Sequence, residues 1–378
     1  MRSKSVIRNS MKVLITAPNL DENTNVSGIS SVVRRIIERG SYEYLHFESG
    51  RRDGEPANLV WIFKQIVSVP RFWRRLVRER VDLVHLNTNY NPLAIVRDAV
   101  YAATARMAGV PVLLHLHGGR FLAEEFKNRW LEKIAEITLR RARVAAVLSE
   151  LEKEIIERRW GKLNVRVLEN AVPFEEAPQQ ERNNPEPVLI FLGRLSESKG
   201  LHEIIEACRR LKNENFGFRF NCFGAGPLKE FFITEMSGIL GDKFYFGGVI
   251  KGAEKWRRLA EADIFLLPSR HGEGLPIAML EAMAAGCVVI ASEMASIGAV
   301  VEDGANGYTI EPGNVSELVT KLKHVLDNKA DWKRLRDNAR AIIKEKFDLD
   351  DYIKKLENIY AEIGKRDLVS RKNIPEKR

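Results

Sequence analysis

The sequence predicts an α/β protein with two doubly wound, Rossmann-like domains that face a central cleft. A chain of 378 residues is long enough for two domains, each with its own hydrophobic core. Short apolar segments alternate with helical segments in both halves, which is the pattern of βαβ units in parallel sheets. The alternation stops once, in a polar segment with three prolines at residues 174–187, which we expect to link the domains.

The individual strands and helices follow from the spacing of apolar residues. In the first half, the expected strands are residues 12–17, 81–86, 110–116 and 144–148. Helices are expected from about Ser30 and over residues 94–108. In the second half, the expected strands are residues 188–192, 218–223, 245–247, 264–267 and 288–291. This order predicts a first domain over residues 1–173 and a second domain over residues 188–346.

The charge of the chain is unevenly distributed. Residues 1–176 hold 29 Lys and Arg and 21 Asp and Glu, a balance of +8 out of a net charge of +9. A basic half suggests an anionic partner, such as a membrane surface, a lipid-linked phosphate or a nucleic acid. A nucleic acid is disfavoured, because the sequence shows no basic helix-turn-helix and no strands that interleave aromatic and basic residues.

Other bulk features favour a cytoplasmic protein. Cys208, Cys222 and Cys287 have neither metal-ligand spacing nor a disulfide pattern, so buried thiols in a reducing compartment are expected. Residues 1–10 are polar and basic without an apolar stretch, which argues against a secretory signal. No apolar run reaches 18 residues, so no membrane-spanning helix is expected.

Two glutamates stand eight positions apart in the segment Glu273-Gly-Leu-Pro-Ile-Ala-Met-Leu-Glu281. The apolar run at residues 264–267 predicts a strand, and residues 277–285 predict a helix that ends at Gly286. Glu273 then follows a strand, and Glu281 lies about two turns into the next helix. Open α/β sheets bind ligands at such junctions, where N–H groups at the start of a helix can hold an anion.

This segment resembles the Glu-x7-Glu signature of retaining glycosyltransferases with the two-domain GT-B fold, the large family often called GT4. Three further segments resemble turns of the same family, in the same order. They are Phe191-Leu-Gly-Arg-Leu-Ser-Glu-Ser-Lys-Gly-Leu201, Phe223-Gly-Ala-Gly-Pro227 and Asp303-Gly-Ala-Asn-Gly307. The resemblance is specific over residues 188–310 and looser in the N-terminal half.

The resemblance implies a role for each domain. The domain at residues 1–173 would bind an acceptor, and the domain at residues 188–346 would bind a nucleotide sugar. Residues 347–378 would hold a helix, near residues 352–363, that crosses back to the first domain, and then a polar tail.

Arg194 and Lys199 lie five positions apart on the loop after the first strand of the second domain. A guanidinium fork and an ammonium group can together neutralise a pyrophosphate. Taken alone, the two residues would be interpreted as ordinary surface cations. The resemblance implies that they bind the donor diphosphate.

Glu281 has apolar neighbours in the sequence, so its carboxylate needs a partner. The resemblance implies that Glu281 accepts the ribose hydroxyls of the donor, and that Glu273 lies against the donor sugar as a catalytic residue. The alternative for Glu273 is an acid that complements the dipole of the following helix.

The main chain beside Glu273 is expected to contribute N–H groups. Gly274 would contact the donor sugar, and Leu275 and Ile277 would contact the phosphates. Many relatives have Gly in place of Pro276. Because proline has no N–H, one donor is missing here.

In the first domain, His117 ends a strand before a glycine pair. The resemblance implies that His117 contacts the donor sugar as a second catalytic residue, and the alternative is a structural histidine. His85 and His115 are expected to be structural. Gly28, preceded by Ser27, takes the place of the family's glycine loop, which lets the main chain approach the diphosphate.

No metal or other cofactor is expected. Asp348-Leu-Asp350 has the spacing of the metal-binding motif of another glycosyltransferase fold. No strand precedes it and a helix follows, so it is interpreted as a cluster at the start of a helix. The charge of the leaving group would instead be met by Arg194, Lys199 and helix N-termini.

Residues 61–80 combine apolar side chains with arginines and could lie in a membrane interface. The apolar members are Trp61, Ile62, Phe63, Ile66, Phe72, Trp73, Leu76 and Val77. The basic members are Arg71, Arg74, Arg75, Arg78 and Arg80. The alternative is a helix that packs on the core and keeps a solvated basic face.

The leading hypothesis is a retaining, metal-independent glycosyltransferase that uses a nucleotide sugar and acts on a lipid-linked glycan of a cell-surface polysaccharide. It would be cytoplasmic, with possible peripheral contact to the inner face of the cell membrane. One alternative is the same chemistry on a soluble sugar phosphate or small glycoside. Another is a nucleotide-sugar-binding protein without catalysis, which the presence of both glutamates and both cations disfavours.

Overall fold

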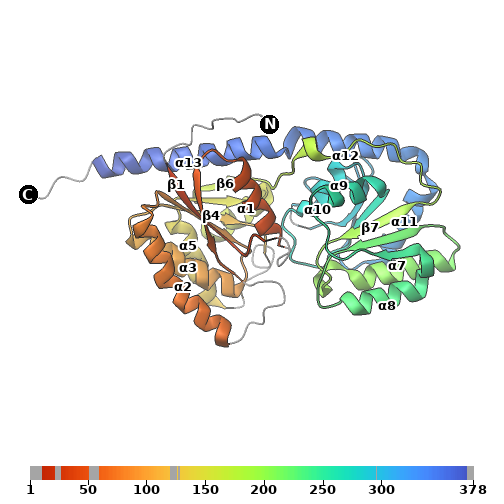
Figure 1. The fold of residues 1–378 in the computed structure, drawn as a ribbon, viewed down its shortest axis with the longest axis horizontal. Coiled ribbons are helices and arrows are strands. Elements are labelled where there is room, and N and C mark those ends of the chain that lie inside the picture. Colours follow the sequence, from red (N-terminus) through yellow and green to blue (C-terminus); the bar gives the residue numbers. More distant parts are fainter. Residues whose placement is uncertain are drawn as a thin grey trace, which may run out of the picture. The chain divides into compact units, whose positions relative to one another are not determined.

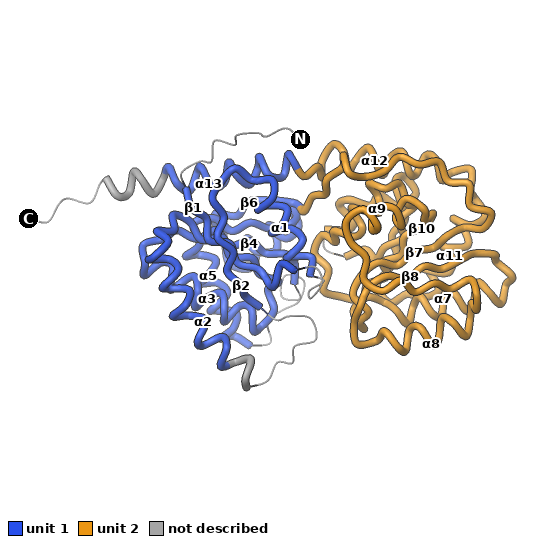
Figure 2. The backbone as a smooth tube through the Cα atoms, in the orientation of Figure 1, with its two compact units in different colours: residues 1–169, 350–378 blue, residues 170–349 orange. Residues whose placement is uncertain are grey.

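The computed structural model describes residues 11–21, 27–50, 59–119, 126, 128–294 and 296–372, with the main chain alone for residues 59–62 and 366–372. The chain forms two compact units (Figure 2). The first unit comprises Met1–Glu169 and Asp350–Arg378, and the second comprises Asn170–Leu349. The first unit is therefore built from two stretches that are far apart in the sequence.

The first unit contains a six-stranded sheet with the order β2-β1-β3-β4-β5-β6. Its strands are β1 (Lys12–Ala17), β2 (Glu43–Glu48), β3 (Leu83–Thr88), β4 (Val112–Leu116), β5 (Val144–Val147) and β6 (Val165–Val167). Its helices are α1 (Gly28–Arg39), α2 (Leu59–Arg78), α3 (Pro92–Met107), α5 (Arg129–Arg141), α6 (Glu150–Trp160) and α13 (Leu349–Lys372). All neighbouring strands are parallel, as βαβ units require.

Helices cover both faces of this sheet (Figure 1). Helices α2, α3, α5 and α6 share one hydrophobic core with alternate strand residues, among them Val84 and Leu86. His85 lies between these two residues and points to the other face. There its Nδ1 lies 2.7 Å from the hydroxyl of Tyr360 in α13. Because Tyr360 is fully buried, the C-terminal helix is part of this unit's core.

The second unit contains another parallel six-stranded sheet, with the order β12-β11-β10-β7-β8-β9. Its strands are β7 (Val188–Leu192), β8 (Arg219–Phe223), β9 (Phe244–Phe246), β10 (Ile264–Leu267), β11 (Val288–Ser292) and β12 (Tyr308–Ile310). Its helices are α7 (Leu201–Asn213), α8 (Lys229–Leu240), α9 (Gly252–Glu261), α10 (Ile277–Ala284), α11 (Val315–Asp327) and α12 (Trp332–Lys346). Helices α7, α8 and α11 pack on one face, and α9, α10 and α12 lie on the other (Figure 1).

The predicted two-domain α/β fold is confirmed, and every expected strand is present with ends that shift by at most two residues. Three observed strands were not predicted. They are β2, β6 and β12. Strands β6 and β12 have only three residues each, and β2 is an edge strand whose residues are only partly buried. None of the three is a continuous apolar run.

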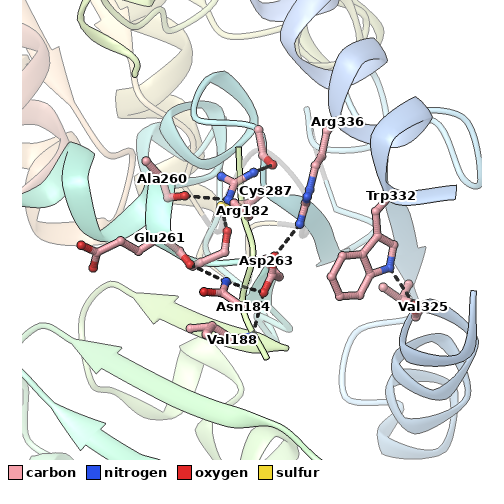
Figure 3. Close-up of polar contacts among 12 residues, drawn as sticks. Arg182, Asn184, Val188, Ala260, Glu261, Asp263, Cys287, Val325, Trp332 and Arg336 are labelled. Atoms are coloured by element: carbon pink, nitrogen blue, oxygen red, sulfur yellow. Dashed lines mark hydrogen bonds and ion pairs between the residues drawn. The ribbon is translucent and has the colours of Figure 1, made fainter. Parts of the chain in front are cut away.

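The segment expected as a linker, residues 174–187, lies within the second unit. Arg182 donates hydrogen bonds to four main-chain carbonyl oxygens. They belong to Leu259, Ala260, Ala285 and Gly286. Asn184 donates to the carboxylate of Asp263 at 2.8 Å (Figure 3). A segment poor in apolar residues can thus belong to a domain, because its polar side chains bind carbonyl oxygens at helix ends.

Asp263 is the centre of this contact. Its buried carboxylate also accepts from Nη2 of Arg336 at 2.6 Å and from the N–H of Val188 at 3.0 Å (Figure 3). The Arg336 guanidinium lies 5.0 Å from the ring centroid of Trp332. Asp263 precedes β10 and Val188 begins β7, so the contact lies at the amino-terminal end of these strands.

Helix α2 is a single element that continues through Pro70. Phe72 and Leu76 are buried in the core, so the expectation that they face a membrane is wrong. The side chains of Trp61 and Ile62 lie outside the described residues. None of the helices in the described part of the chain is long and apolar enough to cross a membrane.

The three cysteines are free and buried, as expected. Burial raises the pKa of the thiols of Cys208 and Cys222, and it raises the pKa of Cys287 to about 11. They therefore remain protonated at neutral pH and act as small apolar side chains.

Candidate functional site

The strand order of the second unit places a switch point between β7 and β10. From β7 the chain continues to β8 on one side, and from β10 it continues to β11 on the other side. Open α/β sheets bind ligands at the carboxyl ends of the strands that flank such a point. The loops that leave β7 and β10 carry Lys199 and Glu273, respectively, so both predicted residues lie at this position.

The two loops are in close contact because Gly200 ends the first of them. Gly200 has φ +70°, and a Cβ added there would lie 1.8 Å from the carbonyl oxygen of Pro268 in the second loop. Only glycine fits this position. The N–H of Arg270 donates to the carbonyl oxygen of Ser198 at 2.8 Å, which ties the loops together.

The ammonium group of Lys199 donates to Oε1 of Glu273 across the two loops. The hydroxyl of Ser269 donates to the same oxygen at 2.6 Å. The side chain of Glu273 is only 7% exposed, whereas that of Lys199 is 23% exposed. A predicted phosphate ligand and a predicted sugar ligand thus form an ion pair in the structure.

Glu281 lies in α10, with only 6% of its side chain exposed. Its Oε1 accepts from the ammonium group of Lys255, which comes from the neighbouring helix α9. The need for a partner that the apolar neighbours of Glu281 indicate is therefore met by an ion pair. Lys255 was not identified from the sequence.

The start of α10 lies between the two glutamates. Leu275 is buried, and its carbonyl oxygen accepts from Nδ2 of Asn170 at 2.7 Å. Pro276 is the cap residue, and Ile277 is the first residue of the helix. The helix ends at Ala284 and Gly286 follows with φ +77°, close to the predicted end. The N–H groups of Gly274, Leu275 and Ile277 are thus part of the loop-to-helix junction, as predicted.

Arg194 is exposed on the loop after β7. Its neighbour Leu195 donates from its N–H to the carbonyl oxygen of Ala225 at 2.9 Å, within the predicted turn at residues 223–227. The third segment that resembles the family, at residues 303–307, does not lie on the loops after β7 and β10. It precedes β12 and is held by an ion pair of 2.7 Å between Lys321 and Asp303.

The first unit has a second group of polar residues at the carboxyl ends of β1, β3 and β4. Asn87 donates from Nδ2 to the carbonyl oxygen of Thr16 at 2.9 Å. Its Oδ1 lies 2.7 Å from Nε2 of His117. Strands β1 and β3 flank the switch point of this sheet, because the chain continues from β1 to β2 on the opposite side. His117 is therefore held beside the expected ligand position of this unit.

The two other histidines of this region are structural, as expected. His85 and His115 are fully buried and their rings are stacked with centroids 5.4 Å apart. Burial lowers the pKa of His85 to about 3 and lowers the pKa of His115 well below its usual value. Both rings are neutral at physiological pH. His115 in turn packs against His117, with ring centroids 4.0 Å apart.

Two further predicted positions are placed by the structure. Gly28 is the first residue of α1, after β1, and a Cβ added there would meet no atom within 4 Å. Asp348 directly precedes α13, and Asp350 lies in its first turn and forms an ion pair of 3.5 Å with Arg39. Among the described residues, no group of three or more His, Cys, Asp or Glu side chains could hold a metal ion.

The residues that the sequence analysis missed are all partners of predicted residues. Lys255 binds Glu281, Ser269 binds Glu273, and Asn87 binds His117. Ser269 and Asn87 had a sequence signal, since both are polar residues at the end of an apolar strand. Lys255 had none, because it is one of several charged residues in the amphipathic helix α9 and its partner lies in another helix.

Comparisons with protein families agree with this geometry. Residues 173–342 match the family "Glycosyl transferases group 1". Residues 30–171 match the family "Glycosyl transferase 4-like domain". The two matches meet near residue 172, close to the boundary between the two units, and together they take up most of the chain.

Individual relatives match over shorter regions. The chain is 36% identical over 140 residues to the putative colanic acid biosynthesis glycosyltransferase WcaL of Salmonella typhimurium, which is 35% of this chain and 34% of the relative. It is 35% identical over 165 residues to the amylovoran biosynthesis glycosyltransferase AmsK of Erwinia amylovora, which is 42% of this chain and 40% of the relative. The matches thus span less than half the length of these two relatives.

The fold is similar to that of solved structures over nearly the whole chain. HepE of Anabaena, solved in complex with UDP-glucose, superposes with a TM-score of 0.73 at 19% sequence identity. The match covers 93% of this chain and all of that one. This similarity shows the GT-B fold.

Proposed function

This chain belongs to the glycosyltransferases with the GT-B fold, and from that membership we propose that it transfers a sugar from a nucleotide-sugar donor with retention of the anomeric configuration. The observation that carries the proposal is the meeting of Lys199 and Glu273 at the switch point of the second unit. A cation and a carboxylate from the loops after two different strands converge there, with a second buried carboxylate, Glu281, in helix α10.

The donor diphosphate would bind Arg194 and Lys199. Lys199 carries a flexible ammonium group, which can exchange the carboxylate of Glu273 for a phosphate oxygen. The N–H groups of Leu275 and Ile277 are further phosphate donors, at a helix start that favours negative charge. Neutralising the diphosphate stabilises it as a leaving group when its bond to the anomeric carbon breaks.

The nucleoside and the sugar would bind on either side of the diphosphate. Glu281 accepts the ribose hydroxyls, and Lys255 pairs with its carboxylate at this buried position. Glu273 and the N–H of Gly274 face the sugar, where positive charge develops on the ring. His117 would contact the sugar from the first unit, and Gly28 would leave room for the diphosphate at the start of α1.

The first test is binding of nucleoside diphosphates, followed by turnover. Isothermal titration with UDP, GDP and ADP should identify one base that binds to wild type. With the matching nucleotide sugar, proton NMR of the product should show the anomeric configuration of the donor. An inverted product would refute retention. Binding without release of nucleoside diphosphate, even by slow hydrolysis, would indicate a binding protein instead.

The roles of Glu273 and His117 predict a distinct kinetic effect. Glu273→Gln and His117→Ala should lower kcat more than they raise KM for the donor, because both side chains face the reacting sugar. Steady-state kinetics at varied donor concentration measures both values. A change in KM alone would assign these residues to ground-state binding.

The reaction would be independent of metal ions. Arg194, Lys199 and the start of α10 supply the positive charge that a divalent cation supplies to diphosphates in other enzymes. Turnover should therefore persist in excess EDTA. Loss of turnover in EDTA with recovery on addition of Mn²⁺ would contradict this. It would indicate a metal site at Asp348 and Asp350 instead.

The acceptor is proposed to be a lipid-linked glycan of a cell-surface polysaccharide. The basic N-terminal half, residues 1–176, which holds +8 of the net charge of +9, and relatives named for colanic acid and amylovoran biosynthesis support this choice. The protein would then work at the inner face of the cell membrane. Transfer to a soluble sugar phosphate in preference to a lipid-linked glycan would favour the alternative acceptor class.

A further inference from the structure

Large apolar side chains that are exposed are concentrated on one side of the first unit. Of the fourteen such side chains among the described residues, ten lie on helices α2, α3 and α5. Helix α3 packs between α2 and α5 on one face of the sheet (Figure 1). Single exposed apolar residues are common on protein surfaces, but a set gathered on three adjacent helices marks an interaction surface.

Helix α3 is the centre of this surface. Its buried side carries Tyr101 and Ala105, which pack in the core. Its outer side carries Leu93, Val96, Val100 and Met107, spaced three, four and seven positions apart along one stripe. Met107 is 79% exposed. A helix on the surface of a soluble domain normally has a polar outer side, so α3 requires an apolar partner on that side.

Helix α2 continues the apolar stripe and adds positive charge. Phe63, Ile66, Trp73 and Val77 are exposed at helical spacing. Four arginines follow one another on the adjacent side of the same helix, and α2 contains no acidic residue. Arg71, Arg74, Arg75 and Arg78, together with Phe47 and Glu79, line a surface cavity of about 350 Å³.

Helix α5 repeats the combination at the other edge of α3. Trp130, in its first turn, is 82% exposed, and Ile137 follows two turns later. Arg140 and Arg141 close the helix. The three helices thus present apolar side chains, with the four arginines of α2 at one edge and, at the other, Arg141 and Arg140, which pairs with Glu136.

We propose that the outer sides of α2, α3 and α5 form a docking face for an anionic lipid bilayer. The apolar stripes of α2 and α3 enter the interface between headgroups and acyl chains, and the arginine cavity takes lipid phosphates. The inference rests on the proposed function for a lipid-linked acceptor, and it adds the surface at which the enzyme meets the membrane. It also moves the centre of contact from residues 61–80 to α3.

An anionic bilayer fits this face better than a protein partner does. A bilayer accepts apolar side chains, and each Lys or Arg near its anionic surface raises the binding affinity roughly fivefold. Protein interfaces also favour Arg, Met and aromatic residues, but four arginines around one cavity are best matched by an extended anionic surface, which a bilayer supplies. A second copy of the chain would bring the same arginines against each other, which repel.

The test uses the full chain and sedimentation with large vesicles. One set of vesicles is phosphatidylcholine alone, and the other contains phosphatidylglycerol in addition. The apolar variant is Val96→Gln, Val100→Gln and Met107→Gln combined, and the basic variant is Arg71→Gln, Arg74→Gln, Arg75→Gln and Arg78→Gln combined. The matched control is Leu151→Gln with Phe231→Gln, which removes two apolar side chains of similar exposure outside the docking face.

Wild type and the control should bind the anionic vesicles equally, and binding to phosphatidylcholine should be much weaker. The partition coefficient of the apolar variant should be lower by roughly tenfold or more, because affinity for the bilayer scales with the apolar area buried in it. The basic variant should lose more than tenfold at low salt and less at high salt. Titration with nucleoside diphosphate should be unchanged in both variants, which separates this proposal from the proposed function.

Three outcomes would overturn the docking face. The first is equal binding of wild type and the apolar variant. The second is equal binding to neutral and anionic vesicles. The third, measured by light scattering without lipid, is a dimer of wild type that the apolar variant converts to monomer, because the face would then be an interface between copies. Circular dichroism of each variant confirms that the substituted helices remain folded.

Discussion

The two ends of the sheet in the second unit both hold buried carboxylates paired with cations, but the pairs are built differently. At the amino-terminal end, Asp263 accepts from a guanidinium, an amide side chain and a main-chain N–H. At the carboxyl-terminal end, Glu281 binds Lys255, and Glu273 binds Lys199 and the Ser269 hydroxyl. The first arrangement uses both oxygens of the carboxylate with donors that the fold holds in place.

The difference separates a structural ion pair from a binding site. The Val188 N–H is part of the main chain at β7, and Arg336 is stacked near Trp332, so neither donor can leave Asp263 without local unfolding. Lys199 and Lys255 carry ammonium groups on flexible stems that are 23% and 19% exposed. Such groups can exchange one anionic partner for another.

The largest expected effect would come from breaking the amino-terminal pair. Asp263→Ala leaves Arg336 and the Val188 N–H without their acceptor, and should lower the free energy of unfolding by about 3–5 kcal/mol. Urea denaturation followed by tryptophan fluorescence measures this loss. Glu273→Ala is the matched control at the other end and should cost clearly less. Equal losses for the two variants would contradict the distinction between the two ends.

An intermediate effect is expected from removing the two cations proposed to bind the donor diphosphate. Arg194→Ala and Lys199→Ala should each weaken nucleoside diphosphate binding by about 1.5–3 kcal/mol, the range for a hydrogen bond to a charged group. The urea midpoint should fall much less than in Asp263→Ala, because Arg194 is exposed and Glu273 keeps the Ser269 hydroxyl as a donor. Isothermal titration gives the affinity, with Arg209→Ala on α7 as a control cation away from the switch point. Unchanged affinity in both variants would remove them from the diphosphate site.

The smallest effect should come from neutralising Glu281. Glu281→Gln keeps an oxygen that can accept from one ribose hydroxyl, so binding should weaken by roughly 0.5–1.5 kcal/mol. KM for the donor should rise while kcat changes little, because the ribose is bound equally in the ground state and the transition state. A fall in kcat at constant KM would mean that Glu281 acts on the sugar instead.

The sequence alone predicts the residues of this comparison that lie in or next to a sequence motif, but not the others. Glu273 and Glu281 follow one apolar strand. Their positions at the end of β10 and within α10 could therefore be predicted from the spacing of apolar residues and from the signals for the helix ends. The pair between Glu281 and Lys255 could not, because it joins two helices and has no sequence period. Asp263 was not noticed for the same reason, since its partners lie at residues 184, 188 and 336.

Two other features were beyond sequence analysis on physical grounds. Residues 174–187 have the composition of a linker, but composition does not reveal that Arg182 binds four carbonyl oxygens of the second unit. Helix α3 has apolar residues on both sides, and a sequence does not show which side a core already covers. The exposed stripe at Leu93, Val96 and Val100 therefore reads as ordinary core until the structure is known.

The discontinuity of the first unit has a consequence for how the protein is made. Tyr352, Leu356, Tyr360 and Ile363 of α13 are buried in that unit, yet the ribosome adds them only after the whole second unit. At about 5–20 residues per second, the intervening chain of residues 170–349 takes on the order of 10–40 s to synthesise. During that time the second unit can fold to completion, while residues 1–169 still lack α13 on one face of their sheet. The side of His85 that Tyr360 covers is then exposed to solvent, so folding of the nascent chain should depend on chaperones that shield the first unit until α13 is added.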